Sequence, residues 1–379
     1  MEKRRISDKL TRIVVKVGTR VLTCGDYRID KSWIKELVAQ IALLLERNIE
    51  VILVTSGAIG AGMGMLKAKT RPKLLPQQQA CAAIGQSQLM KIYDTLFREH
   101  GLLTAQILLT AEDLGNRKRY LNAKNTLLTL LGYKNVVPII NENDTVSVDE
   151  IKFGDNDRLS AQVATLTHAD LLIILSNVDG LYDTRPSKSQ HKLLKKCVIS
   201  RVDKIDCEIE KVATKSLDSI GTGGMATKVQ AAKMCGTSGI ACIVGNGREK
   251  NILLKIVEGQ DVGTLFVPKS EKLEAKKRWI GFSTKLKGEV FVDEGAKQAL
   301  TVSKKSLLAK GIVKIRGNFA VGDTVSIMDI NGKEFARGLA NYSSTELSKI
   351  KGQKSDQIAE ILGYKYYDEA IHRDHLVIL

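Results

Sequence analysis

Residues 12–55, RIVVKVGTRVLTCGDYRIDKSWIKELVAQIALLLERNIEVILVT, form the stretch that decides the fold class. The β-branched run at residues 12–17 predicts a buried strand, and the apolar run at residues 50–55 predicts a second one. Between them, the apolar positions of residues 31–47 recur with the period of a helix. A strand, a helix and a strand in this order form a right-handed unit, so the stretch predicts a parallel sheet covered by helices.

The same alternation continues along most of the chain. Further helices are expected at residues 77–99, 117–131 and 229–235, and further strands at residues 102–109, 136–140, 171–175 and 240–244. A charged linker, PKSEKLEAK at residues 268–276, is followed by short runs punctuated by glycine, which are typical of strands. We therefore predict an α/β domain over residues 1–267, with a mainly parallel sheet sandwiched by helices, and a small β-rich domain over residues 277–379.

The composition is that of a globular protein, with 44% hydrophobic and 26% charged residues. No apolar stretch reaches membrane-spanning length, and the amino-terminal residues do not form a secretory signal. The six cysteines are scattered, without the spacing of a zinc site or a disulfide framework. The sequence therefore predicts no metal site, no membrane partner and a cytoplasmic location.

The net charge of +16 raises the question of nucleic acid as a partner. The basic excess is spread along the whole chain rather than gathered in one segment. A generally basic surface suits anionic small substrates about as well as it suits RNA. The charge alone therefore does not separate these two classes of partner.

Two clusters of Asp and Asn follow the expected strand at residues 136–140. The first, NEND at residues 141–144, lies at the carboxyl end of that strand, where open α/β sheets bind ligands. The second, DND at residues 155–157, precedes a helical pattern that begins at Leu159. Such side chains accept hydrogen bonds from an ammonium group and donate to a carboxylate, so an amino acid is a natural ligand, although Asx residues also form ordinary turns.

Glycine-bearing loops follow several of the expected strands. Lys16 interrupts the first strand and stands before Gly18, and a lysine in a buried strand is costly unless it meets a counter-charge. The loop VTSGAIGAG at residues 54–62 and the loop GTGGMATK at residues 221–228 both lead into expected helices, whose free N–H groups favour an anion. Lys228 lies in the first turn of the second of these helices, next to the positive end of the helix dipole. A lysine at this position is favourable chiefly if an anion binds between the lysine and the helix end.

The common nucleotide-binding fingerprints, G-x-x-x-x-G-K-[ST] and G-x-G-x-x-G, are absent from the sequence. The glycine loops, the two lysines and the amino-acid-like clusters nevertheless fit one kind of chemistry. Transfer of a phosphoryl group between a nucleotide and a carboxylate needs mainly positioning, Mg2+ and cations directed at the migrating group. The residues therefore suggest a phosphotransferase.

The chain closely resembles the glutamate 5-kinase branch of the amino acid kinase family. The motifs that carry the resemblance are VVKVGT (14–19), VTSGAI (54–59), RYLNAKNT (119–126), NENDTV (141–146), FGDNDRLSA (153–161), VDGLYD (178–183) and GTGGMATK (221–228). In addition, RGLANYSSTEL at residues 337–347 resembles the carboxyl-terminal PUA domain of many bacterial members. The resemblance implies the amino acid kinase fold followed by a PUA-like domain.

By the same resemblance, the protein is expected to use ATP and Mg2+ to phosphorylate the side-chain carboxylate of L-glutamate, the first step toward proline. The motif matches imply that the catalytic residues are Lys16, Lys228 and Asp155, the last of which would orient the two lysines. They imply that glutamate is bound by Ser56, Asp144 and Asn156, with Asp144 facing the ammonium group. ATP would be held by Lys16, Ser176, Asn177, Thr222, Gly223, Gly224, Met225, Ala226, Thr227 and Lys228.

The family further implies feedback inhibition by proline and a homo-oligomer. One departure from the family pattern is Ser176-Asn177, where many relatives are expected to have Thr-Asp. Serine keeps the hydroxyl group, whereas asparagine loses a negative charge. The loss of this charge changes the contacts that the family pattern implies here, either with adenosine or with the metal ion.

Two alternatives remain open from the sequence. A uridylate, carbamate or aspartate kinase would share VDGLYD and the Lys-Gly-Thr pattern, but the two Asx clusters and the PUA-like segment favour a glutamate kinase. An RNA-binding or RNA-modifying protein is the alternative from another class, because PUA domains commonly bind RNA. The even charge distribution and the lack of an aromatic-rich basic repeat speak against RNA as a partner.

Overall fold

The structure is a computed structural model that describes residues 10–23, 28–68, 70–146, 155–183, 197–215, 224–268 and 286–379. The chain divides into two compact units near Lys272, and each is described separately. The first unit contains the strands β1 (Arg12–Val17), β2 (Glu50–Val54), β3 (Leu103–Leu109), β4 (Val136–Glu142), β5 (Leu171–Ser176), β6 (Arg201–Val202), β7 (Ala241–Asn246) and β8 (Thr264–Phe266). Its helices are α1 (Thr19–Leu22), α2 (Lys31–Glu46), α3 (Ala58–Met65), α4 (Leu75–Arg98), α5 (Ala111–Gly115), α6 (Arg117–Gly132), α7 (Asp155–Thr167), α8 (Cys207–Lys215), α9 (Met225–Thr237) and α10 (Ile252–Val257).

The strands of the first unit form one eight-stranded sheet in the order β3-β4-β2-β1-β5-β7-β8-β6. All neighbouring pairs are parallel except β7 and β8. The sheet confirms the prediction of a mainly parallel α/β fold, and β1 and β2 lie where the opening stretch of sequence places them. β1 lies between β2 and β5, so the chain crosses to the other side of β1 after β4, and such a reversal of strand order opens a crevice for a ligand.

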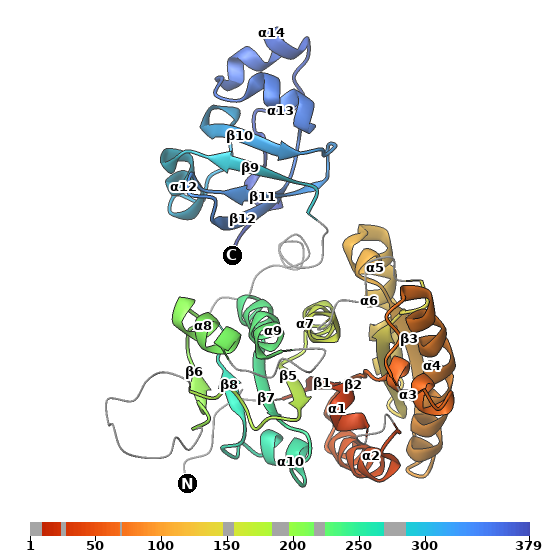
Figure 1. The fold of residues 1–379 in the computed structure, drawn as a ribbon. Helices are drawn as coiled ribbons and strands as arrows, with labels where there is room; N and C mark the ends of the chain where they lie inside the picture. Colours follow the sequence, from red (N-terminus) through yellow and green to blue (C-terminus); the bar gives the residue numbers. More distant parts are fainter. Residues whose placement is uncertain are drawn as a thin grey trace. The chain divides into compact units, whose positions relative to one another are not determined.

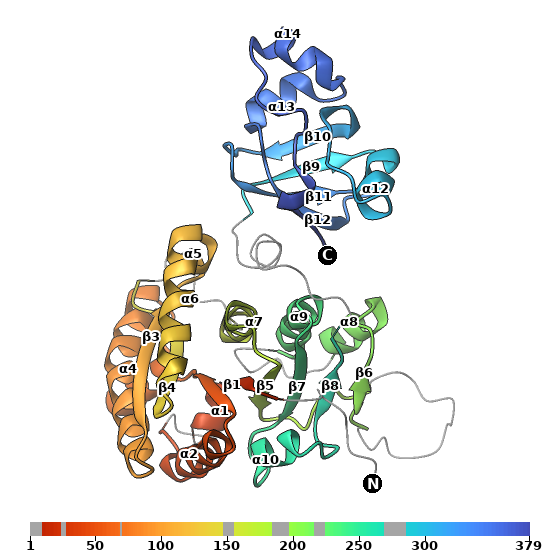
Figure 2. The same cartoon turned by 180° about the vertical axis from the view of Figure 1, so that it is seen from behind.

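Helices cover both faces of this sheet, with α2 and α10 on one face and α7, α8 and α9 on the other (Figures 1 and 2). Successive side chains of a strand point to opposite faces. In β1, Ile13, Val15 and Val17 join the hydrophobic core that α2, α4 and α10 complete. Val14 and Lys16 therefore face α7, which packs across β1 on the opposite side.

α3 and α4 pack in unusually close contact, and two glycines make the approach possible. A Cβ atom at Gly62 would lie 1.9 Å from the carbonyl oxygen of Cys81, and one at Gly85 would lie 1.8 Å from the carbonyl oxygen of Ala58. Backbone atoms cannot move aside as a flexible side chain can. The two glycines therefore fix how α4 lies against the start of α3.

We expect Gly85→Ala to lower the free energy of unfolding by about 1–3 kcal/mol, the usual cost of inserting a methyl group into a packed site. Urea denaturation followed by circular dichroism measures the change. The matched control is Gly132→Ala at the exposed end of α6, where a Cβ atom would meet nothing within 4 Å. Equal stability of the two variants would contradict the steric role of Gly85.

The second unit is a five-stranded sheet in the order β10-β9-β11-β12-β13 with short helices around it (Figure 1). Its elements are β9 (Gly288–Val292), α12 (Glu294–Thr301), β10 (Ile312–Gly317), β11 (Thr324–Met328), β12 (Glu334–Leu339), α13 (Ser344–Ile350), α14 (Ile358–Leu362) and β13 (Leu376–Ile378). The unit has its own core, with Val290, Ile327 and Tyr342 buried at its centre. The β-rich second domain is confirmed, while the exact limits at residues 267 and 277 stay a prediction.

The sequence predicts neither a membrane-spanning segment nor a disulfide framework. Within them, no helix is long and apolar enough to cross a membrane. The five cysteines that the structure describes, at positions 81, 197, 207, 235 and 242, are all free thiols. The cytoplasmic location stays a prediction.

Candidate active site

Polar side chains gather where the central strands of the first unit end. Lys16 lies at the end of β1, Ser56 follows β2, Asn141 lies near the end of β4, and Ser176 ends β5. These four strands are parallel and adjacent, so their carboxyl ends lie on one edge of the sheet. The site therefore forms at the carboxyl ends of the strands on both sides of β1, where the strand order reverses and where open α/β sheets bind ligands.

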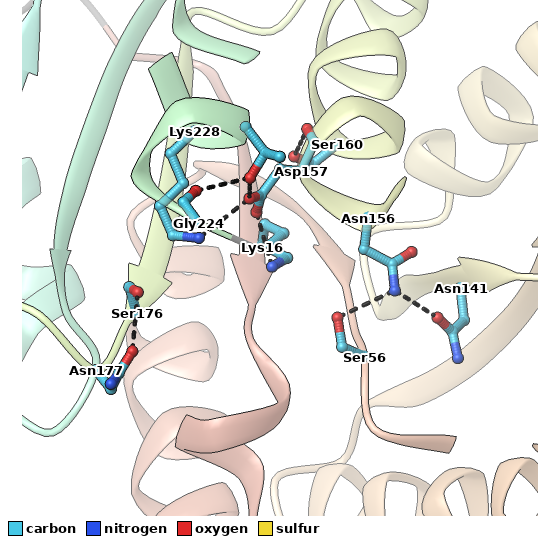
Figure 3. Close-up of polar contacts among 11 residues, drawn as sticks. Lys16, Ser56, Asn141, Asn156, Asp157, Ser160, Ser176, Asn177, Gly224 and Lys228 are labelled. Atoms are coloured by element: carbon cyan, nitrogen blue, oxygen red, sulfur yellow. Dashed lines mark hydrogen bonds and ion pairs between the residues drawn. The ribbon is translucent and has the colours of Figure 1, made fainter. Parts of the chain in front are cut away.

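Two lysines converge on one carboxylate at this edge (Figure 3). Nζ of Lys16 lies 2.8 Å from Oδ1 of Asp157, and Nζ of Lys228 lies 3.1 Å from Oδ2 of the same residue. The hydroxyl group of Thr227 also donates to Oδ2 of Asp157, at 2.7 Å. β1, α7 and α9 each contribute to this group, so strands and helices far apart in the sequence hold the two ammonium groups together.

The cluster is buried, with Lys16, Lys228 and Asp157 only 6%, 5% and 0% exposed. Burial alone would raise the pKa of Asp157, but the charges of Lys16 and Lys228 outweigh it and hold that pKa well below its ordinary value. Burial lowers the pKa of Lys228, and the charge of Lys16 adds to the effect against the attraction of Asp157. An anion bound here would favour the charged form of Lys228, so the cluster is suited to receive a phosphate or a carboxylate.

A second group of polar side chains lies on the other side of the first turn of α7 (Figure 3). It consists of Ser56, Asn141 and Asn156 and is called the carboxamide group below. Nδ2 of Asn156 donates to Oγ of Ser56 at 3.0 Å and to Oδ1 of Asn141 at 3.2 Å. Neighbouring residues of a helix point about 100° apart. The first turn of α7 therefore presents Asn156 to the carboxamide group and Asp157 to the lysines.

The residues expected to hold ATP lie around the start of α9 and the end of β5. Gly224 occupies the N-cap of α9, where it adds no side chain and a Cβ atom would meet open space. Ser176 is buried, and its hydroxyl group donates to Oδ1 of the exposed Asn177 at 3.4 Å. The first turn of α9 contains Met225, Ala226, Thr227 and Lys228, so an anion at this helix end would also meet a lysine. Thr222 and Gly223 lie outside the described residues.

The structure gives a role to residues that the sequence did not assign. Asp157, which the sequence placed in the DND cluster without a role of its own, forms the ion pairs with both lysines. Asp155 begins α7, but its side chain lies outside what the structure describes, so its catalytic role stays a prediction. Asp144 lies half-buried in the turn after β4, and its contact with substrate also stays a prediction. The expectation that Lys16 meets a counter-charge was the signal for this residue, and the DND cluster contains two acids, Asp155 and Asp157, that could supply the charge.

Both units of the chain match known protein families, and similar proteins align with nearly its whole length. The sequence model of the amino acid kinase family matches residues 11–246, and that of the PUA domain matches residues 288–362. The chain is 52% identical to glutamate 5-kinase of Thermoanaerobacter sp. (strain X514) over 97% of this chain and 98% of that protein. It has the same identity and coverage with glutamate 5-kinase of Caldanaerobacter subterraneus subsp. tengcongensis.

Similarity to a more distant relative reaches both ends of the chain. Glutamate 5-kinase of Geobacter sp. (strain M21) is 46% identical over 100% of both chains. The solved structure of UMP kinase from Bacillus anthracis has a TM-score of 0.44 and 14% identity over 69% of this chain and 97% of that one. On the family matches and the full-length relatives, the chain belongs to the amino acid kinase family and, within it, to the glutamate 5-kinases, with a PUA domain at its carboxyl-terminal end.

Proposed function

We propose that the protein transfers the γ-phosphoryl group of ATP to the side-chain carboxylate of L-glutamate, forming L-glutamyl 5-phosphate in proline biosynthesis. The observation that carries the proposal is the buried pair of lysines on Asp157, which places two ammonium groups beside the start of α9. The carboxamide group around Asn156 lies next to it and suits an amino acid. The relatives named glutamate 5-kinase support the choice of glutamate.

The chemistry needs charge stabilisation more than proton transfer. A side-chain carboxylate is ionised at neutral pH, so one of its oxygens can attack the γ-phosphorus without a general base. The new O–P bond forms as the bond from phosphorus to the β,γ-bridging oxygen breaks, and ADP leaves with that electron pair. Lys16 and Lys228 would stabilise the charge on the migrating group. Asp157 would act as a positioning residue, because its low pKa and its ion pairs keep it ionised between the lysines.

The nucleotide would bind with its phosphates at the start of α9, near Gly224 and Lys228, and its remaining contacts near Ser176 and Asn177. Mg2+ would neutralise phosphate charge in the reaction. Within the described residues, no group of three or more His, Cys, Asp or Glu could hold a metal ion. Both oxygens of Asp157 face lysines. Mg2+ is commonly held by substrate phosphates and water, so we infer from this general preference that it arrives with ATP.

Glutamate is expected to be turned over far faster than aspartate. The carboxamide group would hold the amino-acid end, so the shorter side chain of aspartate would leave its reacting carboxylate short of the lysines. A displacement of about 1 Å can cost roughly a hundredfold in rate. A coupled assay of ADP release, with each amino acid at several concentrations, gives the ratio of kcat/KM, and equal turnover would rule out the glutamate assignment.

The same assay separates the other kinase assignments when carbamate and UMP are offered in turn. We expect no ADP release above background with either compound. RNA binding is not favoured as the main function, because relatives that match both domains carry the name of a kinase. Tight filter binding of structured RNA at physiological salt, together with no glutamate-dependent ADP release, would reverse this conclusion.

We also infer that residues 1–267 carry the chemistry, because every residue given a role here lies at or before Lys228. Residues 277–379 would then serve regulation or association. Inhibition by proline and assembly into a homo-oligomer stay predictions from the family resemblance.

A further inference from the structure

Three carboxamide side chains from three different elements are joined end to end in the first unit. Nδ2 of Asn141, in β4, donates to Oε1 of Gln86, in α4, at 2.7 Å. Nδ2 of Asn156, in α7, donates to Oδ1 of Asn141 at 3.2 Å and to Oγ of Ser56 at 3.0 Å. Gln86 thus extends the polar group of the candidate site by one residue that the sequence does not single out.

One backbone group determines which way all three carboxamides point. The N–H of Glu142 donates to Oδ1 of Asn141 at 2.9 Å, and an N–H group can only donate. That atom of Asn141 is therefore the oxygen, and the opposite atom is the nitrogen that donates to Gln86. The atom of Asn156 that faces the same oxygen must be its nitrogen. Each orientation follows from the one before it.

In this series of hydrogen-bonded carboxamides, one donor atom and one acceptor atom have no partner. Nε2 of Gln86 and Oδ1 of Asn156 are both buried, and neither has a hydrogen-bond partner within the described residues. A buried polar atom without a partner is costly, so native proteins rarely keep one without a reason. Two such atoms of opposite kind in one network suggest a ligand that carries both an acceptor and a donor.

We propose that Gln86 is a substrate-binding residue whose Nε2 donates to the α-carboxylate of the amino-acid acceptor, while Oδ1 of Asn156 accepts from its ammonium group. The proposal rests on the function proposed above. The α-carboxylate needs donors and the ammonium needs acceptors, and the chain of carboxamides leaves one of each. Because the backbone fixes both orientations, the site cannot exchange the two ends of the substrate by a simple amide flip.

The packing of α4 supports this role. Gly85 lies against the carbonyl oxygen of Ala58, and that residue begins α3 two positions after Ser56. The close approach that the glycine permits holds the neighbouring Gln86 at a fixed place relative to Ser56. A binding group on a rigid helix loses little freedom when the substrate arrives.

Gln86→Glu is the sharpest test. The new side chain at position 86 keeps an oxygen that can accept from Asn141. It replaces the Nε2 donor with a negatively charged oxygen that would face the α-carboxylate of the substrate. We expect the KM for glutamate to rise by about ten- to a hundredfold, which is the range for losing a hydrogen bond to a charged group. The KM for ATP and the thermal midpoint should stay close to those of the wild type. Gln86→Leu, which removes donor and acceptor together, should raise the KM for glutamate as well.

The control is Gln77→Glu, the same change of charge at an exposed position on the same helix, for which normal kinetics are expected. A second readout uses 4-aminobutyrate, which has the ammonium and the side-chain carboxylate of glutamate but no α-carboxylate. As a competitor of glutamate, it should bind the wild type and Gln86→Leu equally, because it cannot contact Gln86 through the missing group.

The outcomes separate this inference from the proposed function. If the wild type shows no glutamate-dependent ADP release, the proposed function fails. If the wild type is active but both Gln86 variants keep a normal KM for glutamate, only the role of Gln86 fails. A rise in both KM values with a lowered thermal midpoint would assign Gln86 a structural role and overturn the inference.

Discussion

Replacing Lys16 or Lys228 with alanine is expected to lower kcat by about a hundred- to a thousandfold, the size of effect seen when one charged stabiliser of a transition state is removed. Each ammonium group lies within 3.1 Å of Asp157 and is buried, so its field is weakly screened by water. The KM for glutamate should change much less than kcat, because the carboxamide group that would hold the amino-acid end remains intact. Steady-state ADP release gives both constants.

The matched control is Lys233→Ala, on the same helix as Lys228. Lys233 is exposed and pairs with Glu210 at 2.9 Å, so its removal should leave kcat unchanged. Lys228→Arg should restore little activity, because a planar guanidinium group differs in shape from an ammonium group. If either alanine variant is folded by circular dichroism and keeps near-normal kcat, the role assigned to that lysine is wrong.

The sequence predicted those parts of the fold that depend on local patterns. β1 is a run of buried, mostly β-branched residues, and its limits were predicted correctly because hydrophobic pattern and propensity agree there. The short helices α12, α13 and α14 of the second unit were missed. Glycines next to apolar runs are typical of strands and turns alike, and these helices are too short to show a clear period.

The start of α7 shows where local reading reaches its limit. The pattern predicted a helix from Leu159, whereas α7 begins at Asp155. Asp and Asn are common in turns, but they are also favoured in the first turn of a helix, where the backbone N–H groups are free. A helical first turn separates the directions of Asn156 and Asp157, and the site is built on that separation.

The partners of the site residues could not be predicted from the sequence. Lys16 was expected to meet a counter-charge, yet the choice of Asp157 depends on α7 crossing β1, which no local pattern shows. Gln86 lies on a helix that also contains Gln77, Gln78, Gln79 and Gln88, so nothing in the sequence marks it. The close packing of α4 at Gly85 lies next to this glutamine, and the glutamine side chain accepts a hydrogen bond from Asn141.

Asp157→Asn is expected to have the largest effect on stability, a loss of about 3–5 kcal/mol in the free energy of unfolding at pH 7. The carboxylate is 0% exposed and forms ion pairs with two buried lysines. Asparagine has nearly the same shape but no charge, so both ammonium groups would lose this counter-charge while remaining buried. Urea denaturation of the full chain, followed by circular dichroism, measures the loss.

The control is Asp203→Asn, which removes a carboxylate from an exposed pair with Arg201 at 2.8 Å. Both partners of that pair are more than half exposed to solvent, so the change should cost about 0–1 kcal/mol. Similar losses in the two variants would show that Asp157 is not an essential counter-charge.

The dependence on pH gives a second and independent check. The pKa of Asp157 is lower in the folded protein than its ordinary value of 3.8, so its contribution to stability is complete above that value and is lost as the pH falls below it. The difference in stability between the wild type and Asp157→Asn should therefore narrow as the pH falls below about 4. A difference that stays constant from neutral pH down to about pH 3 would mean that the carboxylate charge does not stabilise the lysine pair, and the electrostatic account of the site would have to be given up.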